Sequence, residues 1–181
     1  GNNPKDSEVF IRAAKASCSE NLKNIVLKLE PSSKITIINP VNDDETNKAL
    51  ENMDQYNGVI FTGGAMRLND MSDEIKKHIN FATNCFKYKN KILAICWGLQ
   101  VCSTAAGGKV APGKNGVHIG IATDVEINED GKNNPIYKNK KLYFSLYEFN
   151  NSLISWRCLM NGGQKSLCIS LAHLVLIWTF L

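Results

Sequence analysis

The sequence predicts an α/β fold, specifically a three-layer α/β/α sandwich with a mostly parallel sheet. Short apolar runs, rich in β-branched residues, alternate with stretches whose apolar residues recur at helical spacing. Two of these runs stop abruptly at small residues, as strands do before the loops of a βα unit. The chain has 181 residues, 44% apolar and 21% charged, which is typical of one soluble globular domain.

The first part of the chain is predicted to be helical and then to form a strand. Two helical segments with different apolar faces are expected over residues 7–29, with Asp6 or Ser7 as the N-cap of the first and Pro31 ending the second. The β-branched run at residues 35–38 then predicts a buried strand that stops at Pro40.

The middle of the chain carries the clearest alternation. Residues 58–62 predict a strand that stops at Gly63 and Gly64, and residues 73–86 predict an amphipathic helix with Ser72 as its N-cap. Residues 91–95 predict a third buried strand, followed by a helix over residues 97–106 that two glycines terminate. Apolar and polar residues alternate over residues 119–128, which indicates an antiparallel strand with one solvent-exposed face.

The bulk properties exclude several classes of protein. The net charge of +4 is mild and its lysines are scattered, so no nucleic-acid partner is expected. The six cysteines have no C-x-x-C pair, which argues against a metal site and a disulfide framework, and we expect free thiols in the cytoplasm. The longest apolar stretch, residues 166–181, is shorter than a membrane span, so no membrane partner is expected.

The two ends of the sequence differ from the rest. Charged residues number 36 up to Glu148, but only Arg157 and Lys165 follow. We therefore expect a domain over residues 1–148 and an aberrant hydrophobic tail over residues 149–181, as a shifted reading frame would produce. No buried strand precedes the first helical pattern, so a first strand is expected to be missing.

Cys96 is the candidate nucleophile. It lies where a buried strand turns into a helix, with Ala94 two residues before it and Gly98 two residues after it. A sharp strand-to-helix turn tolerates only small neighbours and raises the side chain above the sheet. The following helix is expected to lower the pKa of the thiol, and the backbone N–H of Trp97 to face an oxyanion. Cys18, Cys85 and Cys102 are expected to be ordinary core residues.

Three motifs in order carry a resemblance to a known family. They are the Gly63-Gly64 turn with the strand before it, Ile95 to Gln100 around Cys96, and Ala105 to Val110. Together they resemble the class I, triad-type glutamine amidotransferases, and in particular stand-alone proteins similar to the amidotransferase domain of GMP synthase. The resemblance covers about residues 5–142 and implies the flavodoxin-like α/β/α architecture, although Ala94 stands where the family usually has Gly.

The resemblance also implies a reaction and a set of roles. Cys96 would attack the side-chain amide of L-glutamine, form a γ-glutamyl thioester and release ammonia, with no cofactor. The N–H groups of Gly64 and Trp97 would hold the oxyanion, with Gly63 beside them. Gln100 would position the glutamine, unless it is a surface helix residue. A synthetase or acceptor-binding partner would use the ammonia, and residues 116–120 would line the pocket.

The acid–base pair is the element that the sequence lacks. The family supplies it as a His-x-Glu or a close variant downstream of the cysteine, but no Asp or Glu follows His78, His118 or His173 at that spacing. His78 is expected at the surface or at its boundary. Two alternatives stay open: a γ-glutamyl peptide hydrolase on the same scaffold, and a catalytically inactive remnant or binding module.

Overall fold

The computed structural model describes residues 4–88, 91–112, 118–127, 132, 137–139, 141, 143–150 and 152–155. Helix α1 (Pro4–Ala14) and helix α2 (Cys18–Leu29) open the chain, followed by α3 (Asp43–Glu51). The central part runs through η1 (Met53–Gln55), β1 (Gly58–Phe61), η2 (Leu68–Asp70), α4 (Asp73–Cys85), β2 (Lys91–Ala94) and α5 (Trp97–Ala105). The strands β3 (Lys109–Pro112), β4 (His118–Glu126), β5 (Tyr143–Asn150) and β6 (Ser152–Ser155) follow.

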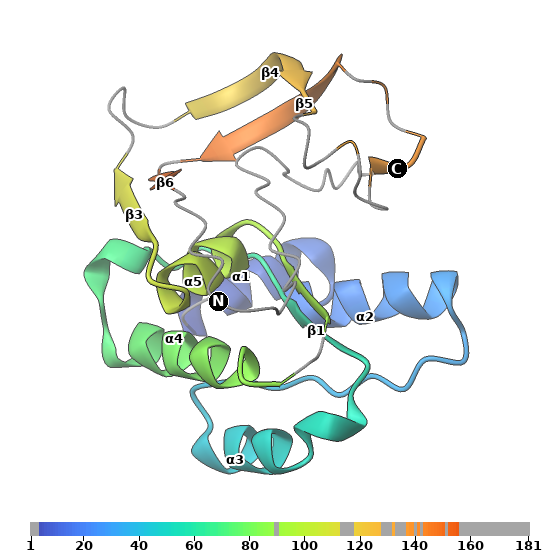
Figure 1. The fold of residues 1–181 in the computed structure, drawn as a ribbon, viewed down its shortest axis with the longest axis vertical. Coiled ribbons are helices and arrows are strands. Elements are labelled where there is room, and N and C mark those ends of the chain that lie inside the picture. The colour runs from blue at the N-terminus through green and yellow to red at the C-terminus, as the bar shows by residue number, and fades with distance from the viewer. Residues whose placement is uncertain are drawn as a thin grey trace.

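A parallel βαβ unit, β1–α4–β2, lies at the centre of the fold. Gly58 pairs with Lys91 and Phe61 with Ala94, so both strands end at the same edge. This confirms the two predicted strands and the helix between them. The other described ladders, β3 with β6 and β4 with β5, are antiparallel. Figure 1 shows the β4–β5 ribbon at one end of the molecule and α3 at the other.

The core lies where α4 and α5 pack on this unit. Its fully buried members include Ile75 and Cys85 from α4 and Val101 and Cys102 from α5. Ser72 caps α4 as predicted, because its hydroxyl accepts the Ile75 N–H at 3.4 Å. At the end of α5, the Gly107 backbone has φ +83°, a conformation that glycine adopts without strain, so the predicted helix stop is confirmed.

The N-terminal predictions are partly wrong. The two helical segments expected over residues 7–29 form as α1 and α2, and Ser17 between them caps α2 in a capping box with Glu20. Helix α1 begins at Pro4, before the expected caps, because proline is well tolerated at the first helical position. The buried strand predicted over residues 35–38 does not form: no ladder includes these residues in the part of the chain that the structure describes, and Ile37 is 41% exposed. β-branched residues favour extended backbone, but a strand also needs an edge to pair with.

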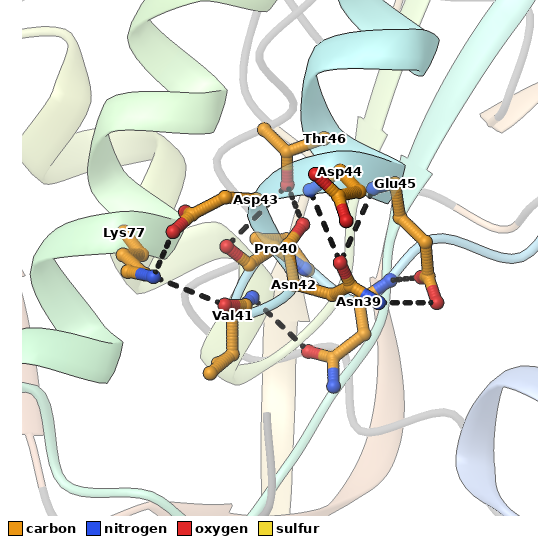
Figure 2. Close-up of polar contacts among 9 residues, drawn as sticks. All are labelled: Asn39, Pro40, Val41, Asn42, Asp43, Asp44, Glu45, Thr46 and Lys77. Atoms are coloured by element: carbon orange, nitrogen blue, oxygen red, sulfur yellow. Dashed lines mark hydrogen bonds and ion pairs between the residues drawn. The ribbon is translucent and has the colours of Figure 1, made fainter.

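A polar cluster joins the start of α3 to α4. Figure 2 shows the Asn42 side chain accepting the N–H groups of Asp44 and Glu45 at 3.1 and 3.3 Å. Lys77 reaches across from α4, donating to the Asp43 carboxylate at 2.7 Å and to the Val41 carbonyl at 3.1 Å. This contact fixes the loop that precedes α3 against the central unit.

The β4–β5 ribbon confirms the predicted antiparallel strand but not its burial pattern. Ile121 belongs to the apolar series of β4 and yet is 62% exposed, while Ile127 is buried. A register shift between Ala122 and Val125 interrupts the alternation. The expected tail lies almost wholly outside the described residues, apart from Phe149, Asn150 and strand β6.

Candidate functional site

The parallel pair brings two loops to one edge of the central unit. The ladder ends at Phe61 and Ala94, and the Ile95 N–H donates to the Phe61 carbonyl at 2.9 Å just beyond it. The loop after β1 then passes directly over the turn after β2. A Cβ placed on Gly63 would lie 3.5 Å from the Cβ of Cys96, in ordinary contact. The two motifs singled out in the sequence therefore lie side by side.

Cys96 occupies a tight strand-to-helix turn. Its φ of 50° and ψ of −113° are rare for a residue with a side chain. The Gly98 N–H closes the turn by donating to the Ile95 carbonyl at 2.9 Å, and the Leu99 N–H donates to the Cys96 carbonyl at 3.0 Å to begin α5. This is the geometry of a nucleophile elbow.

Gly98 is required by the approach of β1 to this turn. A Cβ at position 98 would lie 2.6 Å from the Phe61 carbonyl oxygen and 2.8 Å from the Phe61 Cβ. Since the oxygen belongs to the backbone of a paired strand, it cannot move aside cheaply. Gly98, two residues after the cysteine, therefore allows β1, and with it the Gly63 loop, to approach Cys96.

The electrostatics of the sulfur differ from the sequence prediction. Cys96 is exposed overall, but packing around the sulfur desolvates it and raises the pKa of the thiol above its usual value. The backbone N–H of Trp97 donates to the sulfur and acts in the opposite direction. The predicted net lowering of the pKa is therefore wrong, because desolvation outweighs the helix N-terminus. At neutral pH the residue is held as a thiol.

The first turn of α5 buries the remaining candidates. Trp97 is 3% exposed and Gln100 is 8% exposed, so Gln100 is not a surface helix residue. The Gln100 N–H donates to the Cys96 carbonyl at 3.3 Å, which places the residue one turn beyond the nucleophile. Gly64 follows Gly63 in the loop that contacts Cys96. All five candidate residues thus lie at one end of β1 and β2.

His78 was expected near the surface, but it is buried at 8% exposure on α4. Its ring meets the Trp97 ring edge-on, with centroids 5.0 Å apart and an interplanar angle of 83°. Its spacing of three and four residues from Ile75 and Ala82 places it on the apolar face of α4, and this spacing could have revealed its burial. No hydrogen bond joins a histidine to the Cys96 sulfur in the part of the chain that the structure describes. His173, Gly116 and Val117 lie outside it.

A cleft of about 400 Å³ lies beside the Gly63 loop. It is lined by the loop after β1, η2 and the start of α4, through Ala65, Met66, Arg67, Asp70, Ser72, Glu74 and Ile75. Cys96 is not among the lining residues. Within the described residues, no group of three potential metal ligands is found, and no helix has the length and apolar character needed to cross a membrane.

Comparison with known protein families gives a match over most of the chain. Residues 12–158 match the family described as "Glutamine amidotransferase class-I". A curated relative, a γ-glutamyl-L-1-hydroxyisopropylamide hydrolase from a Pseudomonas species, is 25% identical over 103 residues, which are 55% of this chain and 35% of the relative. The chain thus spans about a third of the length of that relative.

Two solved structures are also similar. A glutamine amidotransferase from Thermotoga maritima has 23% identity and a TM-score of 0.48, covering 56% of this chain and 43% of its own. A candidate GMP synthase component from Thermoplasma acidophilum has 20% identity and a TM-score of 0.47, covering 60% of this chain and 51% of its own.

Proposed function

The chain belongs to the class-I glutamine amidotransferase family, and from this premise we propose that it hydrolyses the side-chain amide of L-glutamine with Cys96 as nucleophile. The observation that supports the proposal is the Cys96 turn, with its positive φ and with Gly63 packed against the cysteine Cβ. A positive φ at a residue with a side chain is costly and is concentrated at functional sites. A core cysteine needs no such turn, as Cys102 shows from within regular α5.

The proposed reaction proceeds in two halves. The Cys96 sulfur, having lost its proton to a base, attacks the amide carbon of glutamine, and the carbonyl electron pair moves onto oxygen. The N–H groups of Gly64 and Trp97 stabilise that oxyanion. When the carbonyl re-forms, the C–N bond breaks, the nitrogen takes a proton and ammonia leaves. Water then hydrolyses the γ-glutamyl thioester, giving glutamate and the free thiol. Gln100 positions the substrate from the first turn of α5.

The test is the release of glutamate from glutamine by the wild-type chain and by Cys96→Ala. Removal of a catalytic nucleophile should lower turnover by at least about 10³-fold. The matched control is Cys102→Ala, which removes a buried thiol from the same helix and should leave turnover within about threefold if the chain remains folded. Equal activity of wild type and Cys96→Ala would reject the proposal.

A second candidate is hydrolysis of substituted γ-glutamyl amides, which the similarity to the Pseudomonas hydrolase favours. It uses the same nucleophile and thioester, so the Cys96→Ala variant cannot separate the two. The kcat/KM values for glutamine and for γ-glutamyl amides of small amino alcohols separate them. A preference for glutamine supports amidotransferase function, and a preference for the substituted amides supports the hydrolase.

We also propose a cytoplasmic location and a synthetase partner, or one that binds the acceptor, to use the ammonia. The family relationship supports such a partner. Its addition should increase glutamine turnover and divert ammonia into an aminated product, which isotope-labelled glutamine would reveal.

A further inference from the structure

The cleft beside the Gly63 loop is lined by charges of both signs. Arg67 supplies the positive charge among its lining residues, and Asp70 and Glu74 supply two negative charges. The rest of the lining is apolar apart from one serine. Ile75 is only 1% exposed and yet lines the cleft, so the cleft extends down to the core. Its volume of about 400 Å³ falls within the range of small-molecule pockets.

The backbone brings these charged residues together. The Asp70 N–H donates to the Arg67 carbonyl at 3.1 Å, so the single turn of η2 separates the two residues. Met71 then has φ 45°, a left-handed conformation that ends η2 just before α4. Glu74 lies in the first turn of that helix. One short turn and the start of one helix thus direct a cation and two carboxylates to the same cleft.

The charges that line the cleft are not neutralised within the protein. Among the residues that the structure describes, Arg67, Asp70 and Glu74 form no ion pair. The two lysines of α4 are paired with carboxylates outside the cleft, at 2.8 and 2.7 Å. The guanidinium and the two carboxylates are therefore available to a ligand.

A free α-amino acid carries the groups that complement this lining. Its α-carboxylate matches the guanidinium of Arg67, which binds carboxylates through two parallel N–H donors. Its α-ammonium matches the carboxylates of Asp70 and Glu74. An aliphatic side chain would then lie on Met66 and Ile75, in the apolar part of the cleft. An anion alone would meet two like charges, and a cation alone would leave Arg67 without a partner.

We propose that this cleft binds a free α-amino acid with an aliphatic side chain, held by Arg67 at its carboxylate and by Asp70 and Glu74 at its ammonium. The site is separate from the one that would hold the glutamine amide, because Cys96 does not line the cleft. The two sites share the loop after β1, which passes over the Cys96 turn before it reaches the cleft. Binding in the cleft requires no reaction at Cys96, so the proposal goes beyond the proposed function and does not depend on it.

The experiment titrates the full chain with L-norvaline and follows the backbone amide chemical shifts by NMR. L-Norvaline is an α-amino acid with an unbranched apolar side chain and no side-chain amide, so it cannot be hydrolysed. Two matched compounds lack one charged group each: pentanoate lacks the ammonium, and butylamine lacks the carboxylate. L-Norvaline should bind saturably, with shift changes concentrated in residues 65–75. Each matched compound should bind more weakly by about fivefold, because it loses one ion pair at an exposed site.

Variants test the role assigned to each charge. Arg67→Met, and the double variant Asp70→Asn, Glu74→Gln, should each weaken L-norvaline binding by about fivefold. Asp73→Asn is the matched control, because Asp73 precedes Glu74 on α4 but does not line the cleft. Asp73→Asn and Cys96→Ala should both bind L-norvaline within about twofold of wild type. Thermal unfolding of each variant reports its stability separately.

Four results would overturn the proposal. They are the absence of saturable binding to wild type, equal affinities for L-norvaline and butylamine, cleft variants that bind like Asp73→Asn, and loss of binding in Cys96→Ala. Equal affinity for butylamine would indicate a site for any cation, such as a basic side chain of a partner protein. If a cleft variant does not fold, the comparison of L-norvaline with the two matched compounds decides. None of these measurements uses glutamine, so absence of glutamine turnover rejects the proposed function alone.

Discussion

The Cys96 backbone predicts an inverted order of stability between two small substitutions. At φ 50° and ψ −113° a residue with a Cβ is strained, at a cost of about 1–3 kcal/mol. Cys96→Gly relieves this strain, while Cys96→Ala keeps it. Glycine also gives the unfolded chain more freedom, which costs about 0.4–1 kcal/mol. The difference leaves Cys96→Gly more stable than Cys96→Ala, by about 1 kcal/mol at the middle of the two ranges.

Thermal and urea unfolding of the two variants measure this difference. For a chain of this size, about 1 kcal/mol corresponds to about 2–4 °C in Tm. Cys102 supplies the matched control, because it lies within regular α5 and is completely buried. There Cys102→Gly should be less stable than Cys102→Ala by about 1 kcal/mol. The reasoning is refuted if Cys96→Gly melts at or below Cys96→Ala.

Three further predictions follow. Gly98→Ala should destabilise the chain by about 1–3 kcal/mol and slow Cys96 alkylation, because the new Cβ would lie 2.6 Å from the Phe61 carbonyl oxygen. Alanine normally favours a helix, so a variant that is stabilised in urea unfolding would contradict this prediction. Burial raises the pKa of Cys85 to about 12. The unfolded thiol ionises near pH 9 while the folded one keeps its proton, so stability should fall as pH rises from 9 to 12, and Cys85→Ala should reduce that fall in unfolding measured across this range. Lys77→Ala should lower the free energy of unfolding by about 1 kcal/mol or less, because it removes an ion pair with the exposed Asp43 and the donor to the Val41 carbonyl. Lys76→Ala, which breaks only an exposed ion pair on the same helix, should lower it by less in parallel unfolding experiments.

The sequence was most informative where local pattern and tertiary contact require the same residue. The strands β1 and β2 are short apolar runs that stop near small residues, and one of these, Gly98, is required by the approach of β1 to the elbow. Gly98 is the clearest case, since its missing Cβ leaves room for the Phe61 backbone. The order of these elements, and the proximity of Gly63 to Cys96, could therefore be predicted.

Properties that depend on distant neighbours were not predicted. Residues 35–38 have strand-forming side chains but no described ladder partner, and Ile121 has the right alternation but remains exposed. The burial of His78 could be read from its spacing along α4, but its contact with Trp97 on α5 could not. The prediction that the pKa of Cys96 is lowered was wrong for the same reason. The helix N-terminus is a local feature, whereas desolvation comes from all the groups packed around the sulfur.

Because the pKa of Cys96 is raised, the elbow can favour attack and stabilise the oxyanion but cannot by itself remove the proton from the sulfur. A thiol whose pKa lies above the ordinary value of 9.0 is at most about 1% thiolate at pH 7. The turn, Gly64 and Trp97 favour attack and stabilise the oxyanion, but they leave the proton on the sulfur. We therefore expect a base to be needed for turnover near neutral pH, supplied by another part of the protein or by a partner. Without it, both alkylation of Cys96 and glutamine turnover should rise about tenfold for each pH unit up to the thiol pKa. A rate that is flat from pH 6 to 8 would instead show that a base already removes the proton.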